Sequence, residues 1–382
     1  MKKTTVTSLL YLILVSQFCQ YLISYRLWLA DIRQIPAMSA FQSLEIAYPY
    51  YVQAFLFIAS LASLLGAIFF RYRQEETHFR KALIAYLLIT SLQVLHDVAC
   101  LQPWLYSHCL FFIFYLLYSQ ESEVFHLQSF RAILGGTYLW SGIQKLNAFF
   151  AQTSLKSLTA GLGVYPFFEA NPWLAHSLGI IEALIGIGML WHFTRKWASW
   201  LGIGMHAFIL FSLLMRGDNF AVVPWNLAWG LAIFLINVKE HDEKSPSFVK
   251  KHYPLLFLVI VLPALSFVDK IDNYLSSALY AGRQTQLVLY FPASETQNLP
   301  ATAQKYIKFA GEGDVNSLSL NVWFLGETQA ANYAEPRYLL RMGEKLCEHF
   351  RNKEMTAYVM FTYPRWEKAY HKETYYCNGT KE

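Results

Sequence analysis

The sequence has little charge for its length. Only 15% of its 382 residues are charged, whereas 55% are hydrophobic and 17% are aromatic. A soluble globular protein usually has about 25% charged residues, so much of this surface must face something other than water. The net charge of +5 is spread over short segments between apolar runs. Because a nucleic-acid site needs a clustered basic patch, no nucleic-acid partner is indicated.

Several catalytic motifs are also missing. The sequence has no nucleophile elbow, no glycine-rich phosphate loop, no His-Glu-x-x-His and no Cys-x-x-Cys. Hydrolase, nucleotide-dependent and zinc mechanisms therefore have no support, and neither a metal nor a nucleotide cofactor is indicated. The sequence also lacks an internal repeat and has few Gly/Pro breaks in matching positions, which argues against a transporter.

Cysteines are few. Cys19, Cys100 and Cys109 lie in or beside apolar runs, where a thiol is usually buried and inert. Cys347 and Cys377 are the only two in the last hundred residues. They would form a disulfide if this region faces an oxidising compartment and their side chains lie close together. The sequence leaves both conditions open.

Long apolar runs fill residues 5–268. A helix needs about 20 apolar residues to cross the hydrocarbon layer. The sequence predicts nine such segments, of which the fourth and ninth are short: Val6–Tyr25, Tyr48–Phe70, Ala82–Cys100, Pro103–Tyr118, Arg131–Phe149, Ala175–Phe193, Ala198–Met215, Ala221–Val238 and Leu255–Val268. We therefore expect an all-α multi-pass transmembrane helix bundle of about eight or nine spans, and a lipid bilayer as partner.

Positive charge alternates between the connecting segments, as the positive-inside rule requires. With a cytoplasmic N-terminus and a retained signal anchor, the cytoplasmic segments would contain Lys2, Lys3, Arg71, Arg73, Arg80, Lys81, Arg131, Arg195, Lys196, Lys239, Lys244, Lys250 and Lys251. The opposite segments would contain only Arg26, Arg33, Lys156 and Arg216. This pattern places the C-terminal region outside the cytoplasm, and we expect a bacterial inner membrane.

The C-terminal region, residues 269–382, has the pattern of a small soluble α+β domain. Residues 1–268 would form the transmembrane domain. Alternating apolar residues predict strands at Gln286–Phe291, Leu318–Phe324 and Ala357–Tyr363. Helical spacing predicts a helix at Pro336–Arg351.

Ionisable residues inside the predicted spans are the first candidates for function, because such groups are costly in a bilayer unless paired or hydrated. Lys145, Glu182 and His206 would lie about 7, 10 and 14 Å from the non-cytoplasmic edge. One pocket that opens to that side would serve all three. His96 and Asp97 form a second pair, which fits helix packing better than a proton relay.

Structural roles for the same residues remain open. Lys145 could extend its stem to the interface, or form an ion pair with Glu182 that only joins two helices. His206 could be a buried histidine bonded to a carbonyl. The Arg216-Gly217-Asp218-Asn219 turn could be an ordinary solvated loop.

A desolvated lysine has a chemical use, because its neutral amine can accept a proton near neutral pH. A neutral histidine can accept or orient a proton. We therefore predict Lys145, His206 and Glu182 as catalytic residues for proton abstraction from a weakly acidic group. The predicted substrate-binding residues are Tyr138, Ser141, Gln144, Asn147, Asp218, Trp225 and Asn226.

The segment Tyr138-Leu-Trp-Ser141-Gly142-Ile-Gln144-Lys145-Leu146-Asn147 resembles the Y-x-x-(A/S)-G-x-x-K-L-(D/N) helix of the HTTM family. That family includes the membrane region of vitamin K-dependent γ-glutamyl carboxylase. The helices that contain Glu182 and His206 follow in the same order, so the similarity covers about residues 131–238. A more distant similarity connects the chain to DoxX-like membrane proteins.

The resemblance implies two functions. In the first, the protein is a carboxylase-like or quinone-linked enzyme, with reduced menaquinone or vitamin K hydroquinone as cofactor and Lys145 as the base. A protein or peptide acceptor would come from the non-cytoplasmic side. In the second, it is a non-catalytic DoxX-like subunit that supports a redox or export partner.

Overall fold

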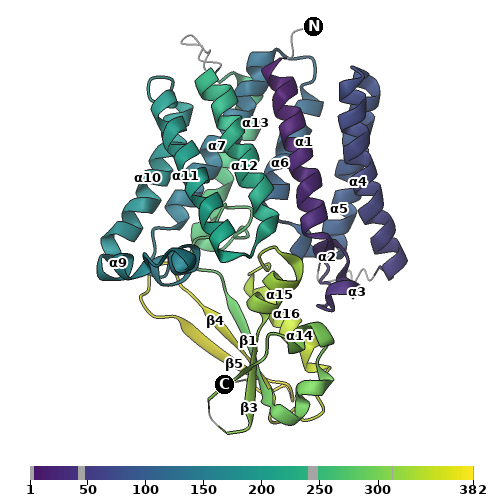
Figure 1. Cartoon of the computed structure of the whole chain (residues 1–382), viewed down its shortest axis with the longest axis vertical. Coiled ribbons are helices and arrows are strands. Elements are labelled where there is room, and N and C mark those ends of the chain that lie inside the picture. Colours follow the sequence, from purple (N-terminus) through teal and green to yellow (C-terminus); the bar gives the residue numbers. More distant parts are fainter. Residues whose placement is uncertain (1–3, 42–47, 240–247, 312, 382) are drawn as a thin grey trace.

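In the computed structural model, helices stand side by side and a small sheet domain covers one end of them (Figure 1). The structure describes residues 4–41, 48–239, 248–311 and 313–381. Lys2, Lys3 and Lys244, which belong to the predicted basic segments, lie outside these described residues. The first described helix, Thr5–Ile23, begins at the end of the bundle opposite the sheet domain (Figure 1). The helix bundle therefore has a covered end and an open end.

The helix bundle runs from residue 5 to residue 268. Its α-helices are α1 (Thr5–Ile23), α2 (Tyr25–Trp28), α3 (Ala30–Arg33), α4 (Tyr50–Tyr72), α5 (Glu76–His96), α6 (Pro103–Leu117), α7 (Glu123–Gln144), α8 (Lys156–Thr159), α9 (Tyr165–Ala170), α10 (Pro172–Leu190), α11 (Arg195–Arg216), α12 (Val223–Ile233) and α13 (Tyr253–Leu256). A π-helical turn extends α12 to Lys239, and π and 3-10 turns extend α13 to Val268.

Six described helical segments are long and apolar enough to cross a membrane: Thr5–Ile23, Tyr50–Tyr72, Pro172–Leu190, Arg195–Arg216, Phe220–Lys239 and Lys250–Val268. The chain is therefore an integral membrane protein. The predicted count of eight or nine spans is not confirmed, because the other three described segments, on α5, α6 and α7, fall short in length or apolarity. Helix α6 has only 15 residues. Charged residues lie in the first turns of α5 and α7.

Helix α7 differs from its prediction at both ends. It begins at Glu123 rather than Arg131, since the Ser122 side chain caps its first turn. Arg131 is therefore not a loop residue: it is buried inside the bundle, where its Nε donates to Asn237 Oδ1. The helix ends at Gln144, so Lys145 is its C-cap residue rather than lying one turn inside. The polar first turn of α7 has the sequence pattern of a loop, which is why the prediction began the helix too late.

Glycines bring α7 and α10 close together. A Cβ atom on Gly142 would lie 2.3 Å from the backbone N of Ala183. A Cβ atom on Gly186 would lie 2.4 Å from the backbone N of Leu139. Only glycine allows this approach of two helix backbones. The close contact places the C-terminal end of α7 directly against the middle of α10.

The sheet domain has five antiparallel strands in the order β2-β3-β1-β4-β5. Its elements are β1 (Gln286–Pro292), α14 (Ala301–Gln304), β2 (Lys308–Phe309), β3 (Val315–Ser319), α15 (Leu320–Thr328), α16 (Pro336–Cys347), β4 (Ala357–Thr362) and β5 (His371–Tyr376). The predicted strand Leu318–Phe324 is wrong beyond Ser319, because β3 ends there and the chain turns helical at Leu320. Leu320, Trp323 and Phe324 are all buried, and their spacing is that of one helix face.

Polar contacts fasten the sheet domain to the bundle. Arg26 forms an ion pair with Glu327 of α15. Gln102 Nε2 donates to Ala331 O at 2.9 Å. Near the end of α7, Arg365 donates to the side chain of Gln144. The domain is therefore positioned directly over the end of the bundle where Lys145 lies.

Cys347 and Cys377 form a disulfide that joins the end of α16 to the segment after β5. We expect a thiol reagent to label three cysteines in the unfolded, unreduced protein and five after reduction, because the other three are free. Intact mass spectrometry measures this directly. The control Cys377→Ser should show four labelled thiols without reduction. Five labelled thiols in the unreduced wild type would mean that the bond does not form.

Candidate functional site

An ion pair joins α7 to α10. Lys145 Nζ lies 2.6 Å from Glu182 Oε2, and the side chains are 12% and 11% exposed. The same ammonium donates to Ser141 Oγ at 2.7 Å, one helical turn back along α7. Lys145 therefore does not extend alone to the interface. It is the cation of a nearly buried pair and holds one serine hydroxyl.

A second polar group lies one turn deeper in the bundle. Tyr138 Oη is hydrogen-bonded to Nε2 of His206 on α11, and His206 Nδ1 lies 2.8 Å from Oδ1 of Asn226 on α12. Asn226 Nδ2 donates to Val222 O, so its Oδ1 is the atom that accepts from His206. His206 Nε2 then accepts from the Tyr138 hydroxyl. The three side chains form one directed chain across three helices.

The two groups are neighbours on α7. The Glu182 carboxylate interacts electrostatically with both Tyr138 and His206. The structure thus brings Lys145 and Glu182 into direct contact and places His206 beside them through Tyr138. None of these three predicted catalytic residues lines the cavity described next. Their role as catalytic residues stays a prediction.

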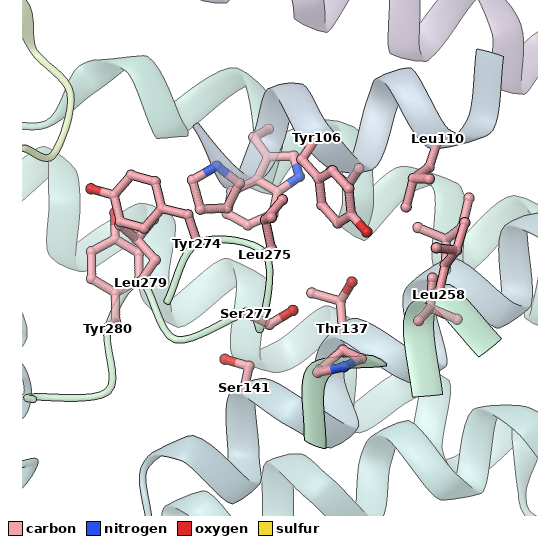
Figure 2. A pocket seen from close by; sticks show the side chains of 16 residues that line it. Tyr106, Leu110, Thr137, Ser141, Leu258, Tyr274, Leu275, Ser277, Leu279 and Tyr280 are labelled. Atoms are coloured by element: carbon pink, nitrogen blue, oxygen red, sulfur yellow. The ribbon is translucent and has the colours of Figure 1, made fainter. Parts of the chain in front are cut away.

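A cavity lies beside α7. It has about 50 Å³ that the centre of a water molecule can occupy, within about 580 Å³ of free space that includes the region open to solvent. One water needs about 10–15 Å³ by the first measure, so the cavity has room for more than one. Its walls come from α6, α7, α12, the Lys250–Val268 segment and the loop at 274–280. The hydroxyls of Thr137, Ser141 and Ser277 point into it (Figure 2).

Ser141 connects the cavity to the ion pair. It lines the cavity, and its Oγ accepts the hydrogen bond from Lys145. Trp225 lines the same cavity beside Asn226, and its buried indole N–H has no hydrogen-bond partner among the described residues. A buried donor without a partner costs about 1–3 kcal/mol, so it indicates a place for an acceptor.

The loop over the cavity has a strained backbone. Ser277 has a positive φ of 59°, which is uncommon for a residue other than glycine. Glu335 holds this loop, because its Oε1 accepts from the backbone N of Asn273 at 2.7 Å. Burial raises the pKa of the Glu335 carboxyl. At Gly282, with φ of 81°, a Cβ atom would lie 2.6 Å from the backbone of Phe150, so the loop is also fixed from the bundle side.

The other predicted residues lie away from the cavity. Gln144 donates to Ser266 Oγ at 2.7 Å, and Asn147 donates to Ala281 O at 2.7 Å, so both hold the chain that enters the sheet domain. Asp218 pairs with Arg216 at 2.7 Å. At the covered end of the bundle, Asp97 pairs with the buried Arg33, whose guanidinium lies over the Phe324 ring of the sheet domain.

Sequence reasoning missed several cavity residues. Thr137 lies one turn before Ser141, so the spacing of two hydroxyl residues on one face of α7 was a usable signal. Tyr106 lies on α6, and Ser277 and Tyr280 lie in the loop between the last helix and the sheet. No local pattern marks these three, because tertiary packing alone brings them to the cavity.

Residues 122–220 match the family model of methylamine utilisation protein MauE. This MauE-like segment covers about a quarter of the chain, from α7 to α11, and contains Lys145, Glu182 and His206. The resemblance to the HTTM and DoxX-like families is therefore wrong, and the carboxylase activity that it implied has no support. No curated protein and no solved structure matches the chain.

Proposed function

We propose that this integral membrane protein binds the head of a quinol-type ligand in the cavity, and that the Lys145–Glu182 pair controls the protonation of that head. One observation carries the proposal: Ser141 lines the cavity and accepts a hydrogen bond from Lys145. A cavity with apolar walls and a few convergent polar groups is the usual form of a small-molecule site.

The hydrogen bonds suggest how the site acts on a ligand oxygen. Lys145 donates to Ser141 Oγ, so the Ser141 hydroxyl proton is free to be donated into the cavity. The indole N–H of Trp225 is a second donor. Two donors directed at one oxygen stabilise negative charge on it, as at an oxyanion site. The ligand hydroxyl then loses its proton more easily.

This arrangement changes the predicted role of Lys145. A lysine that acts as a base must first be neutral. Here its side chain is the cation of an ion pair with Glu182. We therefore assign Lys145 the role of a fixed positive charge behind Ser141, rather than that of the proton acceptor. The Tyr138–His206–Asn226 chain would keep α7 in register with α11 and α12.

We also propose that the sheet domain faces the non-cytoplasmic side. Its disulfide favours an oxidising compartment. The described basic residues Arg71, Lys196 and Lys250 belong to segments at the opposite end of the bundle from the sheet domain (Figure 1). That end would be cytoplasmic by the positive-inside rule.

A second candidate is a non-catalytic membrane subunit that supports a redox or export partner. One observation favours it: the Lys145–Glu182 pair lies where α7 and α10 pack through glycines, so it could serve only to lock the two helices. In that case the cavity would bind no quinol, and a partner would contact the sheet domain. The family name does not distinguish the two candidates.

An absorbance titration of menadiol bound to the purified protein, without oxygen, tests the first candidate. We expect bound menadiol to lose its proton about one pH unit below menadiol in empty micelles, because a nearby positive charge favours the anion. Ser141→Ala should remove most of this shift, because it breaks the link between Lys145 and the ligand.

Lys156→Met is the matched control, because Lys156 lies over the Tyr165 ring in the outer loop and does not line the cavity. It should retain the full shift. If wild-type protein binds menadiol but leaves its titration unchanged, the proposed role of Lys145 is wrong. If it binds no menadiol at all, the second candidate is favoured.

A further inference from the structure

The cavity is polar at one end and apolar at the other. The hydroxyls of Ser277 and Ser141 lie on one side of it, those of Thr137 and Tyr106 lie in the middle, and Leu110 and Leu258 lie at the far side (Figure 2). Ile133 of α7 completes the apolar end. A ligand that satisfies both ends must itself have a polar and an apolar portion.

The two ends also differ in depth. The cavity residues of α7 follow one another at a spacing of four, from Ser141 through Thr137 to Ile133. Counted from the end of the helix at Gln144, they lie about 4, 10 and 16 Å into the bundle. The hydrocarbon layer of a bilayer is about 30 Å thick, so Ile133 would lie near its middle. The polar end of the cavity therefore faces the sheet domain and the apolar end faces the membrane midplane.

This is the orientation of a lipid in the leaflet next to the sheet domain, with its head at the surface and its tail directed inward. We propose that the occupant of the cavity is a single-tailed amphiphile, whose head lies at Thr137, Ser141 and Ser277 and whose apolar tail leaves past Leu110 and Leu258. This rests on the proposed function and adds that the tail is recognised as well as the head.

The loop at 274–280 explains why the head would not leave toward water. Tyr274, Leu275 and Leu279 of this loop cover the polar end of the cavity. Asn273 is bonded to Glu335, and Tyr274 donates to Asn332 O, so the sheet domain holds the cover in place. Exchange of the ligand should therefore occur through the apolar end, between α6 and the Lys250–Val268 segment.

The test compares menaquinone-4, which has an isoprenoid tail, with menadione, which has the same ring and no tail. Binding is measured by equilibrium retention on purified protein in nanodiscs. We expect Leu110→Trp to weaken menaquinone-4 binding at least tenfold and to change menadione binding less than twofold. Leu110 is 7% exposed, so an indole there fills the path of the tail.

Leu117→Trp is the matched control, because it makes the same change on the same helix at a residue that is 68% exposed and does not line the cavity. It should leave both affinities unchanged. A thermal unfolding scan of each variant shows whether Leu110→Trp has damaged the fold. If it has, Leu258→Trp blocks the path from the other wall and should give the same tenfold difference.

The outcomes separate the two proposals. If wild-type protein binds menadione as tightly as menaquinone-4, the tail is not recognised and this inference is overturned, while the proposed function stands. If wild-type protein binds both ligands, but Leu110→Trp and Leu258→Trp weaken the binding of menaquinone-4 and of menadione equally, the inference is overturned as well. If it binds neither, the proposed function itself fails.

Discussion

Replacing Glu182 with alanine is expected to lower the free energy of unfolding by about 3–5 kcal/mol, because it leaves the Lys145 ammonium in a nearly buried site without its partner. The Ser141 hydroxyl alone cannot compensate a full charge. Unfolding of the purified protein by sodium dodecyl sulfate in mixed micelles measures the change.

Two further variants make this result specific. Glu169 on α9 is exposed, so Glu169→Ala should change stability by less than about 0.5 kcal/mol. The double variant Lys145→Met/Glu182→Leu removes both charges and should recover most of the lost stability. A Glu182→Ala protein that is as stable as Glu169→Ala would show that the ion pair does not form.

Replacing Gly186 with alanine should also destabilise the protein, although it adds only one methyl group. The new Cβ would lie 2.4 Å from the backbone N of Leu139 and 2.6 Å from the carbonyl of Gly135. Backbone atoms cannot rotate away as a side chain does, so α7 and α10 must separate. We expect a loss of about 1–3 kcal/mol, together with a weaker Lys145–Glu182 contact, in the same unfolding assay.

Gly204→Ala on α11 is the matched control, because nothing lies within 4 Å of its added Cβ. Alanine is a better helix former than glycine, so this variant should be unchanged or more stable by about 0.5–1 kcal/mol. Equal effects of the two substitutions would mean that α7 and α10 are not packed as closely as described.

The sequence predicted that the protein lies in a membrane and predicted where several elements begin, because both depend on local pattern. Strand β1 and helix α16 begin at the predicted residues Gln286 and Pro336. The sequence pattern gave a wrong prediction where it fits both a strand and a helix. Three buried residues at 320, 323 and 324 fit a short strand by apolarity, and only the helix explains their common face.

The candidate site was predictable to a limited extent. Ionisable residues in apolar segments are rare, so Lys145, Glu182 and His206 stood out without any coordinates. The cavity was not predictable, because its walls come from segments up to 177 residues apart, from Pro103 to Tyr280. The loop at 274–280 covers the cavity because the Glu335 carboxylate of the sheet domain is hydrogen-bonded to Asn273. No local sequence pattern predicts this contact.

The central claim is that Ser141 and Trp225 donate hydrogen bonds to a ligand oxygen inside the cavity. Infrared difference spectroscopy of menaquinone-4 with a ¹³C-labelled carbonyl tests this most directly, because a carbonyl that accepts hydrogen bonds vibrates at lower frequency. We expect a band below that of the same quinone in lipid alone, and its return toward the lipid value in Ser141→Ala. A wild-type band at the lipid position would contradict the account.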